Sequence, residues 1–142
     1  MSKVLILNGP NLDQLGTREP EIYGADTLSD IEEQCVAFGS ELGVEIDFRQ
    51  SNNEADLIKW LHEAAQNECA VIINPAAYTH TSVAIRDAAA ALTAPLIEVH
   101  LSNPLTREEF RHTSFISGVA HGTISGFGVQ SYLLALRALA SL

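Results

Sequence analysis

The chain has 142 residues, of which 46% are hydrophobic, and its formal net charge at pH 7 is −10. This length is enough for one domain with a buried core, and this hydrophobic content excludes a disordered chain. The eight lysine and arginine residues form no basic run, so the sequence predicts neither nucleic acid nor a membrane surface as a partner. An anionic ligand would have to be held by a few focused arginines, because the overall charge repels it.

Cysteine usage and the N-terminal sequence indicate the compartment. Cys35 and Cys69 lie far apart without a C-x-x-C spacing, and we expect both to be buried, reduced thiols. A strand-like run begins at Lys3, which leaves no room for a signal peptide, and no hydrophobic stretch approaches the length of a membrane span. We therefore expect a soluble, cytoplasmic protein.

Strand-like and helix-like segments alternate along the chain. Hydrophobic or alternating runs predict strands at residues 4–7, 44–48, 70–73 and 95–99 and within 115–125. Hydrophobic residues spaced by three and four predict helices at 28–42, from 54 onward, at 82–92 and from 129 onward. Residues 103–112 are polar, with one helical turn expected at 107–110. The order predicts an α/β fold, a flavodoxin-like three-layer sandwich with a five-stranded parallel sheet in the order 2-1-3-4-5.

Capping residues predict where the first two helices begin. Thr27 or Ser29 can cap the first helix, and Glu32 would complete a capping box from Ser29. Ser51 and Glu54 have the spacing of a second capping box.

The segment Asn8–Gly24, which follows the first strand, is long for a connection inside a compact domain. It carries three groups that chemistry could use, Asn11, Arg18 and Tyr23, together with hydrophobic residues that a disordered linker would not need. We expect a lid that packs over a pocket. Taken singly, Tyr23 could equally be a packing residue and Arg18 a surface charge.

Polar residues also follow the third and fourth predicted strands. In the order 2-1-3-4-5 these strands and the first are neighbours, and ligands of open α/β sheets bind beyond the carboxyl ends of the strands. The residues expected to converge there are Asn11, Arg18, Tyr23, Asn74, His80, His100 and Ser102. This set is rich in hydrogen-bond donors and suits a polyhydroxylated, anionic small molecule.

Other site motifs are incomplete or absent in the sequence. Gly126-x-Gly128-x-x-Ser131 lacks the third glycine of a dinucleotide fingerprint, and no acidic residue follows at the required distance. No metal-binding, Walker A or nucleophile-elbow motif occurs, so we expect no metal and no cofactor. The two lysines, Lys3 and Lys59, fall outside the expected pocket, which argues against Schiff-base catalysis. A flavodoxin-like module that binds an anion or nucleotide without reaction remains the alternative.

Several long motifs resemble those of the type II 3-dehydroquinate dehydratases over essentially the whole chain. The motifs are N-G-P-N-L-x-x-L-G-x-R-E-P-x-x-Y-G at 8–24, Q-S-N-x-E at 50–54, I-N-P-x-A-Y-T-H-T-S-V-A-I-R-D at 73–87, E-V-H-x-S-N at 98–103 and R-E-E-F-R-H at 107–112. The resemblance implies a single catalytic domain over residues 1–142. It also implies conversion of 3-dehydroquinate to 3-dehydroshikimate without metal or cofactor, and a homo-oligomer, a dodecamer built from trimers.

Roles carried over by motif position form an acid–base mechanism. Tyr23 would be the general base that removes a proton next to the ketone. Since a free tyrosine has a pKa of about 10, it needs a nearby cation, which Arg18 would supply with help from Arg111. Asn11 would hold a water at the enolate oxygen. His100 would be the general acid, oriented and charged by Glu98 or a neighbouring group.

The resemblance also implies a set of substrate-binding residues: Asn74, His80, Asp87, Leu101, Ser102 and Arg111. Among these, Arg111 is the expected carboxylate clamp and Asp87 is expected to reach a neighbouring subunit's site. The chain departs from the family pattern at Asp13-Gln14, inside the lid, and at positions 55, 76 and 131, where glycine is frequent in the family and this chain has alanine, alanine and serine.

Overall fold

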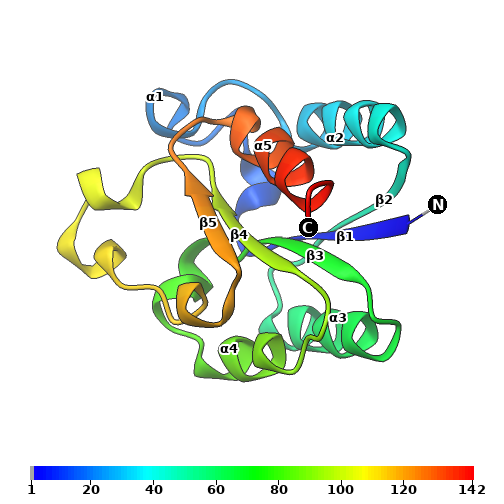
Figure 1. Ribbon diagram of the computed structural model, residues 1–142. Helices are drawn as coiled ribbons and strands as arrows, with labels where there is room; N and C mark the ends of the chain where they lie inside the picture. The colour runs from blue at the N-terminus through cyan, green and yellow to red at the C-terminus, as the bar shows by residue number, and fades with distance from the viewer. Residues whose placement is uncertain (1) are drawn as a thin grey trace.

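The computed structural model describes residues 2–142 and contains one five-stranded parallel sheet (Figure 1). The strands lie in the order β2-β1-β3-β4-β5, which confirms the predicted order. Their bounds are β1 Ser2–Asn8, β2 Val44–Gln50, β3 Ala70–Asn74, β4 Leu96–His100 and β5 Gly122–Ser125. Both β3 and β4 extend one residue beyond their predicted ends, so each finishes on a polar residue of the expected pocket.

Helices cover both faces of the sheet (Figure 1). Their bounds are α1 Pro20–Tyr23, α2 Leu28–Leu42, α3 Glu54–Gln66, α4 Val83–Ala90 and α5 Val129–Leu139. The helices α2 and α5 lie on one face, and α3 and α4 lie on the other. Each pair buries a separate hydrophobic cluster against the sheet, because side chains of successive strand residues point to opposite faces. Among residues 2–142, no helix combines the length and the hydrophobicity needed to cross a bilayer.

The helix caps agree with the predicted ones only in part: Thr27 is confirmed as a cap, but the predicted capping boxes are not formed. Thr27 caps α2 and forms its capping box with Asp30, so the predicted box from Ser29 is wrong. Asn53 caps α3 by accepting a hydrogen bond from the Ala55 N–H. Glu54 does not close a box with Ser51, because its carboxylate accepts a hydrogen bond from Ser82, the cap of α4. This bond links the starts of two helices on the same face.

The polar segment after β4 forms two short 3-10 helices, η3 (Pro104–Thr106) and η4 (Glu109–His112). The predicted helical turn at 107–110 is therefore misplaced. Asn103 caps η3 by accepting a hydrogen bond from the Leu105 N–H, and Pro104 occupies the first helical position. Arg107 lies between the two turns with an extended backbone.

The loops after β1 and β3 are fastened together at the carboxyl edge of the sheet. The N–H of Gly9 donates to the Asn74 carbonyl at 2.8 Å, and a Cβ at position 9 would meet the Pro75 carbonyl oxygen at 2.6 Å. Only glycine permits so close an approach. Another 3-10 helix, η2 (Ala76–His80), follows β3. Its first residue, Ala76, has a φ of 51°, a left-handed backbone conformation that glycine adopts without strain.

The two cysteines have different surroundings. Cys35 is fully buried, and burial raises the pKa of its thiol to about 12, so it is an inert core residue as predicted. Cys69 is only partly buried, so the prediction that both are buried is wrong for Cys69.

Candidate active site

A pocket lies at the carboxyl ends of β1, β3 and β4, on the side of Figure 1 where α1 and the 3-10 turns project. Its lining residues are Pro10, Leu12, Leu15, Arg18, Tyr23, Asn74, Ala76, His80, His100, Leu101, Ser102, Pro104, Arg107 and Arg111. Most of the residues that the sequence singled out are therefore brought together. The buried side chains of Leu12 and Leu15 anchor the loop of residues 8–24 to the core, as expected for a lid.

Two guanidinium groups lie against the ring of Tyr23. The central carbon of Arg18 is 5.1 Å from the ring centroid, and that of Arg107 is 5.0 Å from it. Cations at these distances interact favourably with an aromatic ring. Arg18 has a second partner in Glu19, at 3.6 Å, but its side chain remains 41% exposed.

Arg107 is the site residue that sequence reasoning missed. Its side chain is 14% exposed, and its Nη1 donates to the Ser102 hydroxyl at 3.4 Å. Within residues 2–142 its Nε is buried and has no hydrogen-bond partner, while the Glu108 carboxylate lies 3.9 Å away. Because buried donors are normally paired, an unpaired arginine nitrogen beside a pocket indicates a place for an acceptor atom of a ligand. The sequence pattern predicted a helical turn at 107–110, and Arg107 was not among the predicted site residues.

His100 and Glu98 form a hydrogen-bonded pair at the end of β4. The Nε2 of His100 lies 2.5 Å from Oε2 of Glu98, whose side chain is 1% exposed. Burial alone would raise the pKa of the Glu98 carboxyl. The hydrogen bond and charge of His100, with hydrogen bonds from Ser117 and Thr79, outweigh burial and hold that pKa below its usual value. Since Nε2 is engaged by Glu98, Nδ1 is the ring nitrogen left for the pocket.

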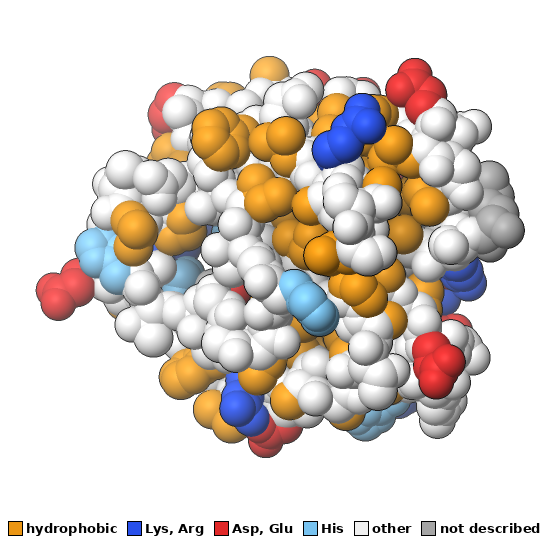
Figure 2. Space-filling model, viewed as in Figure 1, with side chains coloured by type: hydrophobic (Ala, Val, Ile, Leu, Met, Phe, Trp, Pro, Cys, Tyr) orange, Lys and Arg blue, Asp and Glu red, His pale blue; other side chains and the backbone are white. Residues whose placement is uncertain are grey.

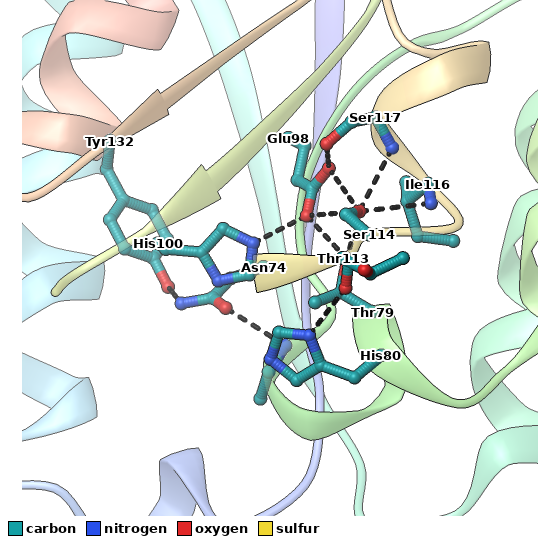
Figure 3. A network of polar contacts seen from close by, with 11 residues as sticks. Asn74, Thr79, His80, Glu98, His100, Thr113, Ser114, Ile116, Ser117 and Tyr132 are labelled. Carbon is teal, nitrogen blue, oxygen red and sulfur yellow. Dashed lines mark hydrogen bonds and ion pairs between the residues drawn. The ribbon is translucent and has the colours of Figure 1, made fainter. Parts of the chain in front are cut away.

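Hydrogen bonds also fix His80 and Asn74 (Figure 3). The Nδ1 of His80 lies 2.7 Å from the Thr113 carbonyl, which can only accept, so Nδ1 carries the hydrogen. A neutral His80 therefore offers Nε2 as an acceptor. Asn74 donates to the hydroxyl of Tyr132 at 3.0 Å and accepts from the Ala76 N–H at 3.1 Å. The Tyr132 hydroxyl in turn donates to Asn8 at 2.6 Å.

Three predicted site residues lie outside the pocket lining. Glu98 lies behind His100, to which it is bonded. Asn11 sits in the lid with a φ of 70°, and its backbone N–H bonds to the Asn52 side chain at 2.9 Å. Asp87 is exposed on α4 and pairs with Arg86 at 2.9 Å.

Arg111 lines the pocket, but its contacts within the chain are not with Tyr23. Its Nε donates to Glu108 at 2.9 Å, and its guanidinium lies 4.8 Å from the Phe110 ring centroid. The second cation at Tyr23 is Arg107.

A larger hollow lies at the opposite edge of the sheet, between the starts of β1 and β3 and the end of α5. Its two cations are already paired: Lys3 with Asp47, and Arg49 with Asp47 and Glu63. This pairing makes it a weaker candidate than the pocket at Tyr23. In the part of the chain that the structure describes, no three His, Cys, Asp or Glu side chains gather as a metal site would require.

The fold and the pocket together define an α/β protein with a polar pocket at the carboxyl edge of its sheet. The family model described as Dehydroquinase class II matches residues 2–140. The chain belongs to this family, whose members are hydro-lyases.

Named relatives and solved structures agree with this assignment. The chain is 57% identical over 141 residues to the 3-dehydroquinate dehydratase of Sinorhizobium medicae, covering 99% of this chain and 95% of the relative. It is 58% identical over 133 residues to that of Maricaulis maris, covering 94% and 91%. The structure of the type II dehydroquinase from Propionibacterium acnes superimposes with a TM-score of 0.98 at 47% identity, covering 100% of this chain and 98% of that one.

Proposed function

We propose that this enzyme dehydrates 3-dehydroquinate to 3-dehydroshikimate through an enolate, with Tyr23 as general base and His100 as general acid. The observation that supports this most strongly is the contact of the Tyr23 ring with two guanidinium groups, those of Arg18 and Arg107, in the same pocket as His100. A phenol is normally too weakly acidic to serve as a base at neutral pH. The positive charge that such a base needs nearby would come from these two guanidinium groups.

In the first step the Tyr23 phenolate takes a proton from the carbon next to the substrate's ketone. The electron pair moves onto the ketone oxygen and forms the enolate. Asn11 would hold a water that donates to this oxygen. Its backbone is anchored to Asn52 on the loop after β2, so the lid residue has a fixed point near the pocket.

In the second step the enolate collapses and the β-hydroxyl leaves. His100 supplies a proton to that hydroxyl, so that water departs, and the double bond forms next to the ketone. Because Glu98 engages Nε2, the proton would come from Nδ1. The hydrogen bond to the buried Glu98 carboxylate holds the imidazole ring in a fixed orientation for this step.

Substrate binding would use the remaining polar groups of the pocket. The acceptor nitrogen of His80, the Asn74 amide and the Leu101–Ser102 turn suit the hydroxyl groups and the carboxylate. Arg111 is the proposed carboxylate clamp, since a guanidinium binds a carboxylate with two parallel hydrogen bonds. The unpaired Nε of Arg107 offers a further donor for the same anion.

We propose in addition that the enzyme is a homo-oligomer, and we expect a dodecamer that is built from trimers. Several large hydrophobic side chains are exposed, among them Val83, Phe110 and Phe115 and, in and around α5, Phe127, Leu134 and Leu142. Figure 2 shows hydrophobic side chains gathered over α5. Burial of such surfaces between copies would remove them from water. We propose that Asp87, which is exposed on α4, contributes to the site of a neighbouring subunit.

The direct test is to mix the protein, after metal removal with EDTA, with 3-dehydroquinate and follow ultraviolet absorption of the conjugated product. We expect absorption to rise and to survive both EDTA and borohydride. Folded protein that gives no rise, or that binds flavin or nucleotide tightly instead, would contradict the proposal and favour a binding module.

A further inference from the structure

Three hydroxyl groups surround the carboxylate of Glu98 (Figure 3). We call Thr79, Ser114 and Ser117 the hydroxyl cluster. The Thr79 hydroxyl lies 2.6 Å from Oε2 of Glu98, and that of Ser117 lies 2.6 Å from Oε1. The Ser114 hydroxyl lies 3.0 and 3.1 Å from the two carboxylate oxygens and 2.5 Å from the Thr79 hydroxyl. These groups come from η2 and from the loop before β5, and they converge on a strand residue.

The direction of each hydrogen bond follows from the number of donors and acceptors. The backbone N–H groups of Ile116 and Ser117 both donate to the Ser114 oxygen, at 3.1 Å each. A hydroxyl oxygen accepts two hydrogen bonds, so Ser114 has no acceptor capacity left for Thr79. The Thr79 hydrogen must therefore point to Glu98, and the Ser114 hydrogen to Glu98 or Thr79. Every hydroxyl hydrogen of the cluster therefore points either to the carboxylate or to another hydroxyl of the cluster.

We propose that the hydroxyl cluster keeps Glu98 ionised throughout turnover, so that the catalytic proton stays on His100 and is not passed to Glu98. Thr79, Ser114 and Ser117 are then positioning residues that act on His100 through Glu98. The inference rests on the proposed role of His100 as general acid.

A neutral Glu98 does not fit this arrangement. The hydrogen of a protonated carboxyl would face the hydroxyl hydrogens and the Nε2 hydrogen of His100. One of the hydrogen bonds to Glu98 would then have to break, although the Glu98 side chain is only 1% exposed and water could not replace the lost bond. The lowered pKa of the Glu98 carboxyl has the same cause. His100 is the ionisable group in contact with Glu98. The cluster residues are neutral, and His80, also on η2, bonds the Thr113 carbonyl.

Thr79→Val is the sharpest perturbation. Thr79 is 1% exposed, so the valine methyl group replaces the hydroxyl at nearly the same volume and leaves little room for water to replace the lost donor. We expect kcat to fall about tenfold to a hundredfold with KM unchanged, as is typical when a group that orients a catalytic residue is removed. Thr79→Ser should restore kcat. Thr93→Val is the matched control. Thr93 precedes the start of β4, whereas His100 is at the end of that strand, so this variant should behave as wild type.

The pH profile separates this role from a merely structural one. Loss of a donor raises the pKa of Glu98, so the acidic edge of the kcat profile should move to higher pH in Thr79→Val and return in Thr79→Ser. A Thr79→Val enzyme with the wild-type kcat and the wild-type acidic edge would overturn the proposal. If Thr79→Val does not fold, Ser117→Ala gives the same comparison on the other carboxylate oxygen.

A double-mutant cycle tests whether the cluster acts through His100. In a His100→Asn background, Thr79→Val should cost no further activity, because the group it positions is already gone. An equal loss in both backgrounds would refute the inference. The single variant His100→Asn separates the general-acid role of His100 from the positioning role of the hydroxyl cluster. If His100→Asn retains the wild-type rate, the general-acid role itself is wrong. If it loses activity while Thr79→Val does not, only the role of the cluster is wrong.

Discussion

Tyr132 joins the core to the candidate site, and Tyr132→Phe tests how much that link contributes to stability. The Tyr132 side chain is fully buried beneath the ends of β1 and β3, where Asn8 and Asn74 lie opposite each other in the sheet. Its hydroxyl donates to Asn8 and accepts from Asn74. Phenylalanine would leave one buried acceptor and one buried donor unpaired. Each costs about 1–3 kcal/mol, so we expect a loss of about 2–6 kcal/mol in the free energy of unfolding.

The assay is urea denaturation of both variants at one protein concentration, since oligomerisation makes stability concentration-dependent. Tyr78→Phe is the matched control: its hydroxyl donates to the Asn52 carbonyl at 2.8 Å in an exposed position. There we expect a change within about 0.5 kcal/mol. A loss below about 1 kcal/mol for Tyr132→Phe at an unchanged m-value would refute the reasoning that buried pairing at Asn8 and Asn74 is worth this much.

Three further predictions concern single residues. Ala76→Gly should stabilise the protein by about 0.5–1 kcal/mol in the same denaturation assay. Glycine relieves the strain of a left-handed alanine, which outweighs the greater flexibility of the unfolded chain. A loss of stability would show that the packing of the alanine methyl group outweighs the relief of strain. Arg107→Ala should lower kcat/KM at least tenfold in the absorption assay, whereas Arg137→Ala, an arginine that lies over Phe38, should not. The pKa of Glu98 is lower in the folded than in the unfolded protein, so its ionisation adds stability above the unfolded pKa of about 4.3. This stability is lost as the pH falls further. We therefore expect the free energy of unfolding of Glu98→Gln to fall less steeply with decreasing pH in this range than that of wild type.

The strand order could be predicted from sequence because strand-like and helix-like segments alternate along the chain, although the fifth strand could be located only within residues 115–125. That order was also enough to place Tyr23, Asn74 and His100 at one edge of the sheet, since the carboxyl ends of neighbouring parallel strands meet there. The proposed catalytic roles came from the family resemblance and stay predictions.

Features that depend on irregular backbone could not be predicted. Arg107 reaches Tyr23 because the chain is extended between two 3-10 turns, whereas the sequence pattern indicated a helical turn there. Tyr132 has the spacing of an ordinary core residue on α5, and nothing in that spacing indicates its hydroxyl partners on β1 and β3. The hydroxyl cluster joins residue 79 to residues 114 and 117, which only the folded loops bring together.

The central claim is that the Tyr23 phenolate removes the substrate proton, and turnover of 3-dehydroquinate by Tyr23→Phe tests it most directly. Phenylalanine keeps the ring in contact with Arg18 and Arg107 and removes only the oxygen, so the fold and substrate affinity should be retained. The account predicts that kcat falls on the order of 10²–10⁴-fold, the usual contribution of a general base. Tyr78→Phe, measured alongside, should keep the wild-type rate. A Tyr23→Phe enzyme with a rate near that of wild type would contradict the account.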